Sequence, residues 1–235
     1  MQLILVQKEI FIMLNKISKS LIIGFTFISL FASASSSKEV FYKGNYYKLS
    51  IPEGFCDMTD TSTGKFLKSF LNDTFAKTGE SLSAKIIYTK CGKKIDPKNL
   101  HPWGYVGISE NDNTSQKELN EFAKKNMNAD FMKEIEGLVN KAGNKTLEDY
   151  KLSSLVGKVE VSMGKPEILW TDDNSLIVYT RMSDGITLQD GVYSTTMLPK
   201  LTIFTYLYDA VKNNPDVMGM ASKLDKVART NVKSN

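Results

Sequence analysis

Residues 192–208, VYSTTMLPKLTIFTYLY, hold the pattern that decides the fold. Two strand-like runs, 192–198 and 200–208, meet at a short turn. Successive side chains of a strand point to opposite faces of a sheet. The second run therefore places its aliphatic residues on one face and its aromatic residues, Phe204, Tyr206 and Tyr208, on the other. The segment predicts two adjacent strands whose aromatic face is either covered by helices or exposed to a protein or glycan partner.

Further strand patterns lie on both sides of this segment. Gly44-Asn45 separates the first two and is typical of a two-residue hairpin turn, because both residue types accept positive φ angles. Asp172-Asp173-Asn174 is a turn sequence between two later ones. The predicted strands span residues 40–43, 46–51, 81–91, 103–109, 155–163, 167–171 and 175–182.

Three amphipathic helical patterns complete the chain. Residues 65–77 are followed by Gly79, a residue type common at helix ends. Residues 115–142 begin with an S-x-x-E capping box, divide near their middle asparagines, and are expected to end at Gly143. Their apolar stripe contains Leu119, Phe122, Ala123, Met127, Phe131, Ile135, Leu138 and Val139. The last helix is predicted to begin at Asn214-Pro215, with an inner face of Val217, Met220, Ala221, Leu224, Val227 and Ala228.

The order of these patterns predicts the α+β fold class. Consecutive strands joined by short turns pair antiparallel, whereas strands that alternate with helices form parallel sheets. We expect a single domain over residues 35–235, in which an antiparallel sheet of about six to seven strands packs against helices.

Composition excludes several kinds of site. The 235 residues include 30 basic and 26 acidic side chains, and a net charge of +4 is too small to indicate nucleic-acid binding. Only Arg181 and Arg229 are arginines, the residue type best suited to clamp phosphate and carboxylate groups. The single histidine, His101, excludes a metal site built from several histidines. No motif indicates a cofactor.

The N-terminal residues contain the three parts of a secretory signal peptide. Lys16 and Lys19 precede the apolar run 21–31, and Ala32-Ser33-Ala34 follows it as a cleavage pattern. A membrane-spanning helix needs about 20 apolar residues, and this run is much shorter. Residues 1–34 therefore predict a signal peptide, with translation starting at Met13.

Cleavage between Ala34 and Ser35 would release an exported protein. The remaining chain has 27 basic and 25 acidic residues, a net charge of +2. So small a charge indicates neither a membrane surface nor a polyanion as partner. We expect a periplasmic or secreted protein without stable membrane insertion after cleavage.

Cys56 and Cys91 would meet an oxidising compartment after export, where a disulfide is the expected state of two cysteines. The alternative is a reactive thiol paired with His101. Neither cysteine belongs to a C-x-x-C motif, and no clear helix N-terminus follows Cys91 to lower the pKa of its thiol. The sequence favours the structural disulfide.

His101 and Trp103 are the candidate functional residues. A histidine-based triad would need a nucleophile, but the chain lacks the G-x-S-x-G elbow that presents a catalytic serine. Asp172-Asp173-Asn174 lacks the alternating ligands and the distal glutamate of a calcium loop, so a hairpin turn is the favoured interpretation. A pair of catalytic carboxylates stays open, because such pairs are defined by distance in space.

Residues 46–56, YYKLSIPEGFC, combine a hairpin strand, an Ile-Pro break and a cysteine before a helix. With the later strands and the closing helix, this pattern resembles the PsbP-like class of exported α/β proteins. That class includes DcrB-like periplasmic proteins, and the pattern is also similar to periplasmic proteins with a P-x-G-[YF]-C start. The resemblance implies an antiparallel sheet between helices, usually without enzymatic activity. It implies no partner and no functional residue beyond the cysteine pair and the turn at residues 51–54.

Three functions are compatible with these features. The first is a non-catalytic accessory protein that binds an unidentified envelope or extracellular protein. The second is a secreted hydrolase with a carboxylate- or His101-based site. The third is a secreted virulence-associated protein, since a lysine-rich, arginine-poor composition suits an AT-rich bacterial genome. The missing catalytic motifs favour the first function.

Overall fold

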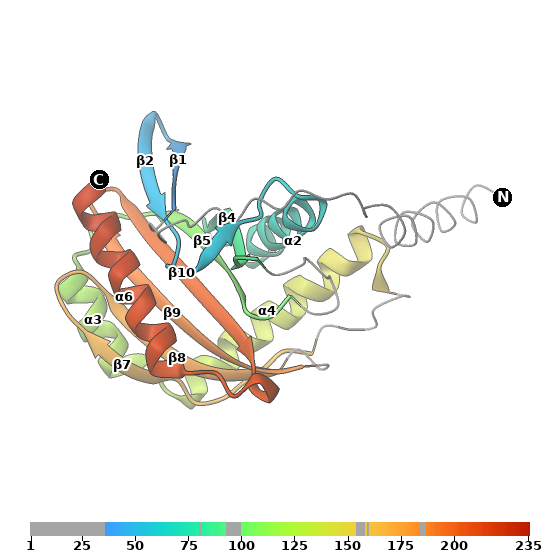
Figure 1. Ribbon diagram of the computed structural model, residues 1–235. Coiled ribbons are helices and arrows are strands. Elements are labelled where there is room, and N and C mark those ends of the chain that lie inside the picture. Colours follow the sequence, from blue (N-terminus) through green and yellow to red (C-terminus); the bar gives the residue numbers. More distant parts are fainter. Residues whose placement is uncertain (1–35, 80, 93–99, 154–157, 159, 184–186) are drawn as a thin grey trace. The chain divides into compact units, whose positions relative to one another are not determined.

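The computed structural model describes residues 36–79, 81–92, 100–153, 158, 160–183 and 187–235 (Figure 1). The expected signal peptide, with its cleavage site at Ala34 and Ser35, lies outside the described residues. Residues 155–157 and 159 of one expected strand lie outside them too. Within the described ranges, no helix has the length and apolar character needed to cross a membrane.

An eight-stranded antiparallel sheet forms the centre of the described chain, with the order β3-β4-β5-β10-β9-β8-β6 and β7 paired to β8. The predicted α+β class is confirmed. This sheet has more strands than the six to seven expected, partly because β3 has only three residues and shows no periodicity. Of the strand expected over residues 155–163, only Ser162–Met163 form a strand, β6, among the described residues. The strands are β3 (Phe55–Asp57), β4 (Ser83–Lys90), β5 (Trp103–Glu110), β6 (Ser162–Met163), β7 (Glu167–Thr171), β8 (Leu176–Ser183), β9 (Leu188–Leu198) and β10 (Leu201–Ala210).

The segment that decided the fold lies at the middle of this sheet. Strands β9 and β10 pair from Leu201 and Leu198 onward, and β10 pairs with β5 along its other edge. Lys200 adopts a φ of 66° in the short turn between them. Because β10 has a strand on each side, its backbone groups are bonded along both edges, and both of its faces are available for helices to cover.

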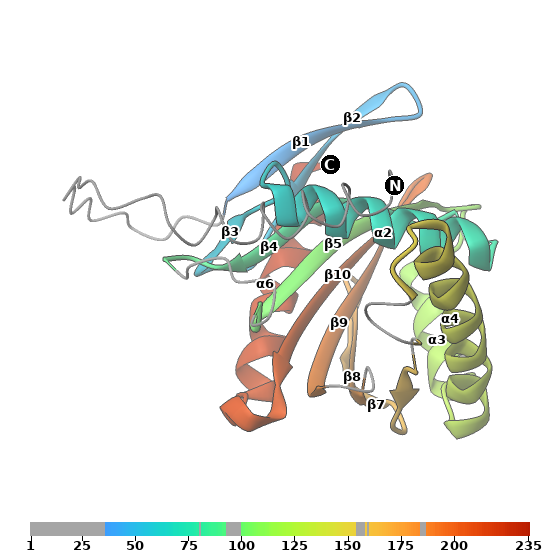
Figure 2. The same ribbon diagram turned by 90° about the vertical axis from the view of Figure 1, so that its right-hand side faces the viewer.

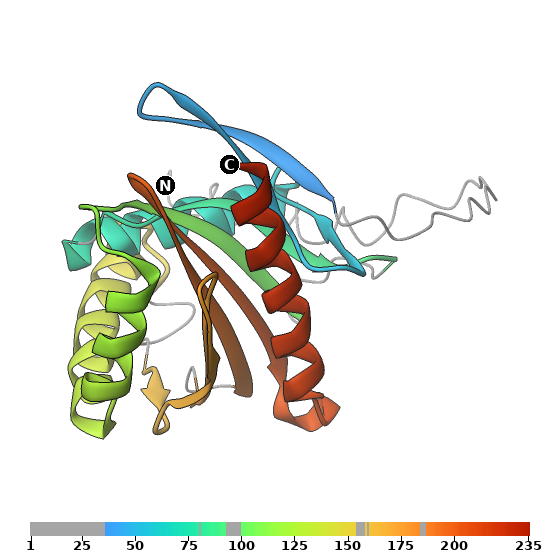
Figure 3. The ribbon, with the colours of Figure 1, turned by 90° about the vertical axis from the view of Figure 1, so that its left-hand side faces the viewer.

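Helices cover both faces of the sheet (Figure 2 and Figure 3). Helix α6 (Val217–Ser234) lies against β8, β9 and β10 on one face. On the other face, α2 (Ser62–Thr78) contacts β4 and α3 (Gln116–Asn126) contacts β8 and β9, while α4 (Ala129–Asp149) packs on α2. The main core under α6 includes Ile86, Tyr88, Val106, Ile108, Ile177, Val192, Ile203, Leu207, Ala221 and Leu224.

Capping residues set several helix ends as the sequence predicted. Gly79 ends α2 in a left-handed conformation with a φ of 80°. Ser115 and Glu118 form the predicted capping box of α3, with the Ser115 hydroxyl 3.2 Å from the Glu118 amide nitrogen. Asn128 caps the start of α4, so the long helical pattern divides where its asparagines predicted.

Two predicted helix ends are wrong. Helix α4 continues through Gly143 to Asp149, because its last turns pack on α2 and bury Thr146 within 3.2 Å of Thr74 (Oγ1 to Oγ1). The C-terminal helix begins at Val217 rather than at Asn214, which adopts a left-handed φ of 49°. Asp216 caps it instead, since its carboxylate accepts the amide of Gly219 at 2.9 Å. Its inner face is as predicted.

Strands β1 (Ser37–Tyr42) and β2 (Asn45–Ser50) form a separate hairpin that projects beyond the sheet (Figure 1). Its turn is Lys43-Gly44, with φ angles of 45° and 84°, one residue earlier than the sequence predicted. The shift follows from register, because Tyr42 pairs directly with Asn45 and leaves two residues for the turn.

Candidate functional site

The disulfide lies at one edge of the sheet. Cys56 in β3 and Cys91, directly after β4, are joined by an S–S bond of 2.02 Å with their Cα atoms 5.0 Å apart. The predicted bond is therefore present, and no cysteine is left free. The alternative of a reactive thiol paired with His101 is excluded in this structure.

His101 and Trp103 lie beside that edge. Thr89 of β4 is the register partner of Cys56 on one side and of Trp103 on the other. Its hydroxyl also donates to the Pro102 carbonyl at 2.9 Å, which ties the half-buried His101 segment to the sheet. Across the described ranges, no three histidine, cysteine or acidic side chains come together in a way that could hold a metal ion.

The Asp172 side chain has a structural role. Its Oδ1 atom accepts the amide groups of Asn174 at 2.7 Å and Ser175 at 2.9 Å, and its Oδ2 atom pairs with Arg229. These contacts form the turn that the Asp172-Asp173-Asn174 sequence favoured. Both oxygens of this carboxylate are engaged within the fold.

Six aromatic side chains form a continuous cluster on the sheet face that α2 and α3 border. The rings of Tyr105 and Tyr206 stack with centroids 4.5 Å apart, and Tyr193 lies 5.5 Å from Tyr206. Trp103 lies 5.3 Å from Tyr208, so this candidate residue belongs to the cluster. The rings therefore pack against one another across three neighbouring strands. The cluster contains Trp103, Tyr105, Tyr193, Phe204, Tyr206 and Tyr208.

Helices border this aromatic cluster on two sides. Phe75 of α2 lies 6.0 Å from Tyr105 (ring centroid to ring centroid), and α3 packs against the Tyr193 side. Burial raises the pKa of the Tyr105 and Tyr208 hydroxyls, and charges on neighbouring tyrosines would raise it further. The hydroxyls therefore stay neutral. Tyr105 is buried and the other five side chains of the cluster are half-buried, so the helices border the aromatic face without covering it completely.

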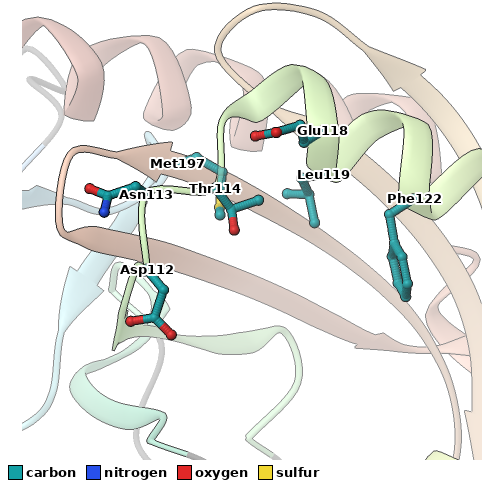
Figure 4. Close-up of a pocket in the computed structure, with 7 residues that line it drawn as sticks. All are labelled: Asp112, Asn113, Thr114, Glu118, Leu119, Phe122 and Met197. Carbon is teal, nitrogen blue, oxygen red and sulfur yellow. The ribbon is translucent and has the colours of Figure 1, made fainter.

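A hollow of about 580 Å³ opens where the β5–α3 loop meets the start of α3 (Figure 4). The buried side chain of Asn111 shapes the loop, since its amide donates to the Leu198 carbonyl at 2.8 Å and to the Thr114 carbonyl at 2.9 Å. This anchors the loop to the end of β9 and holds the hollow open beside it. We call this feature the α3 hollow, and its lining residues are Asp112, Asn113, Thr114, Glu118, Leu119, Phe122 and Met197.

The α3 hollow combines an apolar wall with an acidic rim. Leu119, Phe122 and Met197 form the wall, and Phe122 is 52% exposed. Asp112 and Glu118 lie at the rim, and none of the seven described lining residues is basic. Hydrogen bonds from the Ser115 backbone and hydroxyl lower the pKa of Glu118, so that its carboxylate stays charged. The arrangement can bind an apolar group that carries or neighbours a positive charge.

Phe122 corrects a prediction, because the sequence placed it in an apolar stripe that faces the core. The residues of α3 that pack against the sheet are Leu119, Ala123 and Met127, spaced four apart. Phe122 lies on the adjoining face of the helix, where it contacts Phe131 of α4 edge to face at 6.4 Å. Leu138 of the same stripe is 43% exposed. Periodicity alone did not distinguish these side chains from core residues.

Comparison with known proteins identifies no family for this chain. No protein-family description and no curated protein matches the sequence. One solved structure that aligns with the chain is the solution structure of cyanobacterial PsbP (CyanoP) from Synechocystis sp. PCC 6803. The alignment has 12% sequence identity and a TM-score of 0.42, and it covers 83% of this chain and 93% of that one. Similarity at this level says nothing about what the chain binds.

Proposed function

We propose that the chain is a non-catalytic, exported accessory protein that binds a protein partner through the α3 hollow. The observation that carries the proposal is the exposure of Phe122, 52%, on the wall of a hollow of about 580 Å³. Covering an exposed apolar side chain with another molecule stabilises the complex. For a half-exposed phenylalanine at a concave site, the favourable contribution to binding is about 1–2 kcal/mol.

The chemistry of the hollow supports binding rather than catalysis. Asn111 and the Ser115–Glu118 capping box fix its loop and its helix start, so the binding surface is preformed. Its two acidic side chains lie on an open rim, whereas a catalytic carboxylic acid is typically enclosed in an apolar pocket. In the parts of the chain that the structure describes, we find no observation that favours a secreted hydrolase or a secreted virulence-associated protein.

The disulfide supports an exported location. Disulfides persist in the periplasm and outside the cell and are rare in the cytosol. The bond between Cys56 and Cys91 and the signal pattern of residues 1–34 both support the proposal that the protein is periplasmic or secreted. Its partner would be an envelope or extracellular protein.

Affinity capture from the native envelope fraction tests this function. The exported protein and its Phe122→Ser variant serve as baits. Leu188→Ser is the matched control, because Leu188 is 48% exposed on β9 and does not line the hollow. We expect one protein to be recovered by the parent and the control and lost with Phe122→Ser.

Equal recovery by all three baits would overturn the assignment to the α3 hollow. A turnover in a hydrolase screen that His101→Ala abolishes would overturn the non-catalytic function itself. The unfolding temperature of each variant is also measured, so that partner recovery is compared only among baits that are folded.

A further inference from the structure

Positive charge is concentrated on two neighbouring elements, the β1–β2 hairpin and α6. Residues 37–50 contain three lysines and one acid, and α6 contains four basic residues and one acid. The two elements therefore carry +5, whereas residues 35–235 together carry +2 and the rest of that stretch is negative. Acidic side chains of other elements neutralise part of this charge, because Lys38 pairs with Asp57 and Asp60, Lys43 with Glu110 and Arg229 with Asp172. The positive charge that concerns us here is therefore that of the lysines of α6.

The exposed side of α6 contains a basic hollow of about 360 Å³. Arg229 is partly neutralised by Asp225, 2.9 Å away, and by Asp172. Lys226 and Lys233 are exposed, and the described residues give neither of them an ion-pair partner. Such a hollow fits a phosphate-bearing head group. Its lining residues are Glu53, Lys223, Lys226, Val227, Arg229, Thr230 and Lys233.

The hairpin adds the two most exposed aromatic side chains of the described chain. Phe41 is 60% exposed and Tyr46 is 73% exposed. They are register partners, with ring centroids 5.1 Å apart, and they share the outer face of the hairpin with Lys48 and Glu39. The inner-face residues Val40, Tyr42 and Tyr47 pack against the main core instead.

Hydrogen bonds connect the hairpin to the C-terminal part of α6. The Asn235 side chain accepts the Lys48 amide at 2.7 Å and donates to the Lys48 carbonyl at 3.0 Å. Asn231 accepts the amide of Ser50 at 2.9 Å. An ion pair between Lys43 and Glu110 fixes the turn to β5. Figure 3 shows the hairpin crossing the C-terminal end of α6. Tyr46 is two residues from Lys48, which Asn235 contacts, so the aromatic pair lies close to that end of the helix.

We propose that this hairpin–α6 surface docks the protein peripherally on an anionic phospholipid bilayer. Phe41 and Tyr46 would enter the interface between head groups and acyl chains, and Lys226 and Lys233 would contact lipid phosphates. Aromatic residues beside lysines are typical of proteins that lie on a membrane without spanning it. The inference is independent of the α3 hollow.

The position of the hairpin in the chain favours a membrane over an acidic protein as the occupant. The hairpin begins at Ser37, six residues after the apolar run 21–31 ends. Six extended residues span at most about 20 Å. Before signal cleavage the hairpin would therefore be held within reach of the bilayer, an argument that rests on the proposed export.

Vesicle co-sedimentation of the exported protein tests the inference. The vesicles contain phosphatidylcholine, with or without phosphatidylglycerol. We expect binding only when phosphatidylglycerol is present, weakened by added salt because exposed charges are screened. The double variant Phe41→Ser/Tyr46→Ser should lose binding at least about tenfold, and Lys226→Gln/Lys233→Gln about fivefold for each lysine removed.

Matched control variants test whether vesicle binding depends on the hairpin–α6 surface or on any exposed apolar or basic side chain. Leu188→Ser removes an equally apolar exposed side chain, and Lys117→Gln/Lys124→Gln removes two exposed lysines from α3. Both should bind the vesicles as the parent does. Binding that is unchanged in the hairpin and α6 variants would overturn the inference, and so would equal binding to neutral vesicles.

Soluble glycerol phosphate distinguishes a bilayer from a free anion. Saturable binding of glycerol phosphate without any vesicle binding would overturn the bilayer as the occupant, as would binding to polyglutamate alone. The partner captured through the α3 hollow should be unaffected by the hairpin variants, so that failure of one proposal leaves the other intact.

Discussion

Arg181 and Asp190 face each other across β8 and β9 as register partners. The Arg181 Nε atom lies 2.8 Å from Asp190 Oδ1, and its Nη2 atom lies 3.2 Å from Oδ2. The Asp190 side chain is 4% exposed, whereas that of Arg181 is 50% exposed. The Tyr179 hydroxyl donates a third hydrogen bond to the Asp190 carboxylate, at Oδ1, with a length of 2.9 Å. One of the two arginines in the chain is thus used to satisfy a buried carboxylate.

Arg181→Met should lower the free energy of unfolding by about 2–3 kcal/mol, because it leaves the Asp190 carboxylate buried with one remaining side-chain donor. Arg229→Met is the control, since its ion pairs are more exposed and should be worth less than about 1 kcal/mol. Urea unfolding at neutral pH measures both. Similar losses in the two variants would contradict the structural role of the Arg181–Asp190 pair.

Gly104→Ala should destabilise the protein by about 1–3 kcal/mol or more, as overpacking does in well-packed cores. A Cβ atom at this position would lie 2.0 Å from the Tyr206 carbonyl oxygen and 2.6 Å from the Tyr88 ring. Gly137→Ala is the matched control, because a Cβ there meets nothing within 4 Å and the exposed helix position gains about 0.5–1 kcal/mol. Thermal unfolding should therefore shift in opposite directions for the two variants.

Replacing Cys56 and Cys91 by alanine should lower stability by roughly 3–4 kcal/mol, the chain-entropy estimate for a closed loop of this length. The bond joins residues separated by 35 positions in sequence. Chemical denaturation of the parent and the double variant measures the loss. Thiol titration of the exported, unreduced parent should find no reactive thiol, and two titratable thiols would contradict the bond.

Asp57 should make stability depend on pH in acid. Burial alone would raise the pKa of its carboxyl, but hydrogen bonds from Thr59 and the ammonium group of Lys38, 3.1 Å away, hold that pKa below its ordinary value of 3.8. A depressed folded-state pKa contributes stability above the unfolded pKa and loses it as pH falls through the folded value. Asp57→Asn should therefore unfold more easily at pH 7 and lose less stability below about pH 4. Parallel stability profiles for the two proteins would contradict this.

Local sequence patterns were sufficient for most of the elements and for the fold class. The alternation in residues 192–208 predicted β9 and β10, because side chains of a strand face opposite sides whatever packs on them. The Ser115–Glu118 capping box and Gly79 predicted helix ends through groups only a few residues apart. The disulfide was predicted because an exported chain with two cysteines is expected to join them, and the bond is present.

The candidate surfaces depended on contacts between distant residues, which local patterns do not contain. Phe122 belongs to an apolar stripe in sequence, but α3 covers the sheet with its neighbouring face and leaves this ring exposed. Asn231 and Asn235 hold β2 from more than 180 positions away, which brings the hairpin aromatics to the basic end of α6.

The sequence by itself determined which segments form strands and helices, because backbone geometry imposes a period of two or 3.6 on the side chains of any one segment. It also determined the fold class and the disulfide. Only the tertiary structure decided which apolar side chains stay in contact with water, how far α4 extends beyond Gly143, and where positive charge gathers. Those outcomes follow from which surfaces meet in three dimensions, and burial is a property of both partners in a contact.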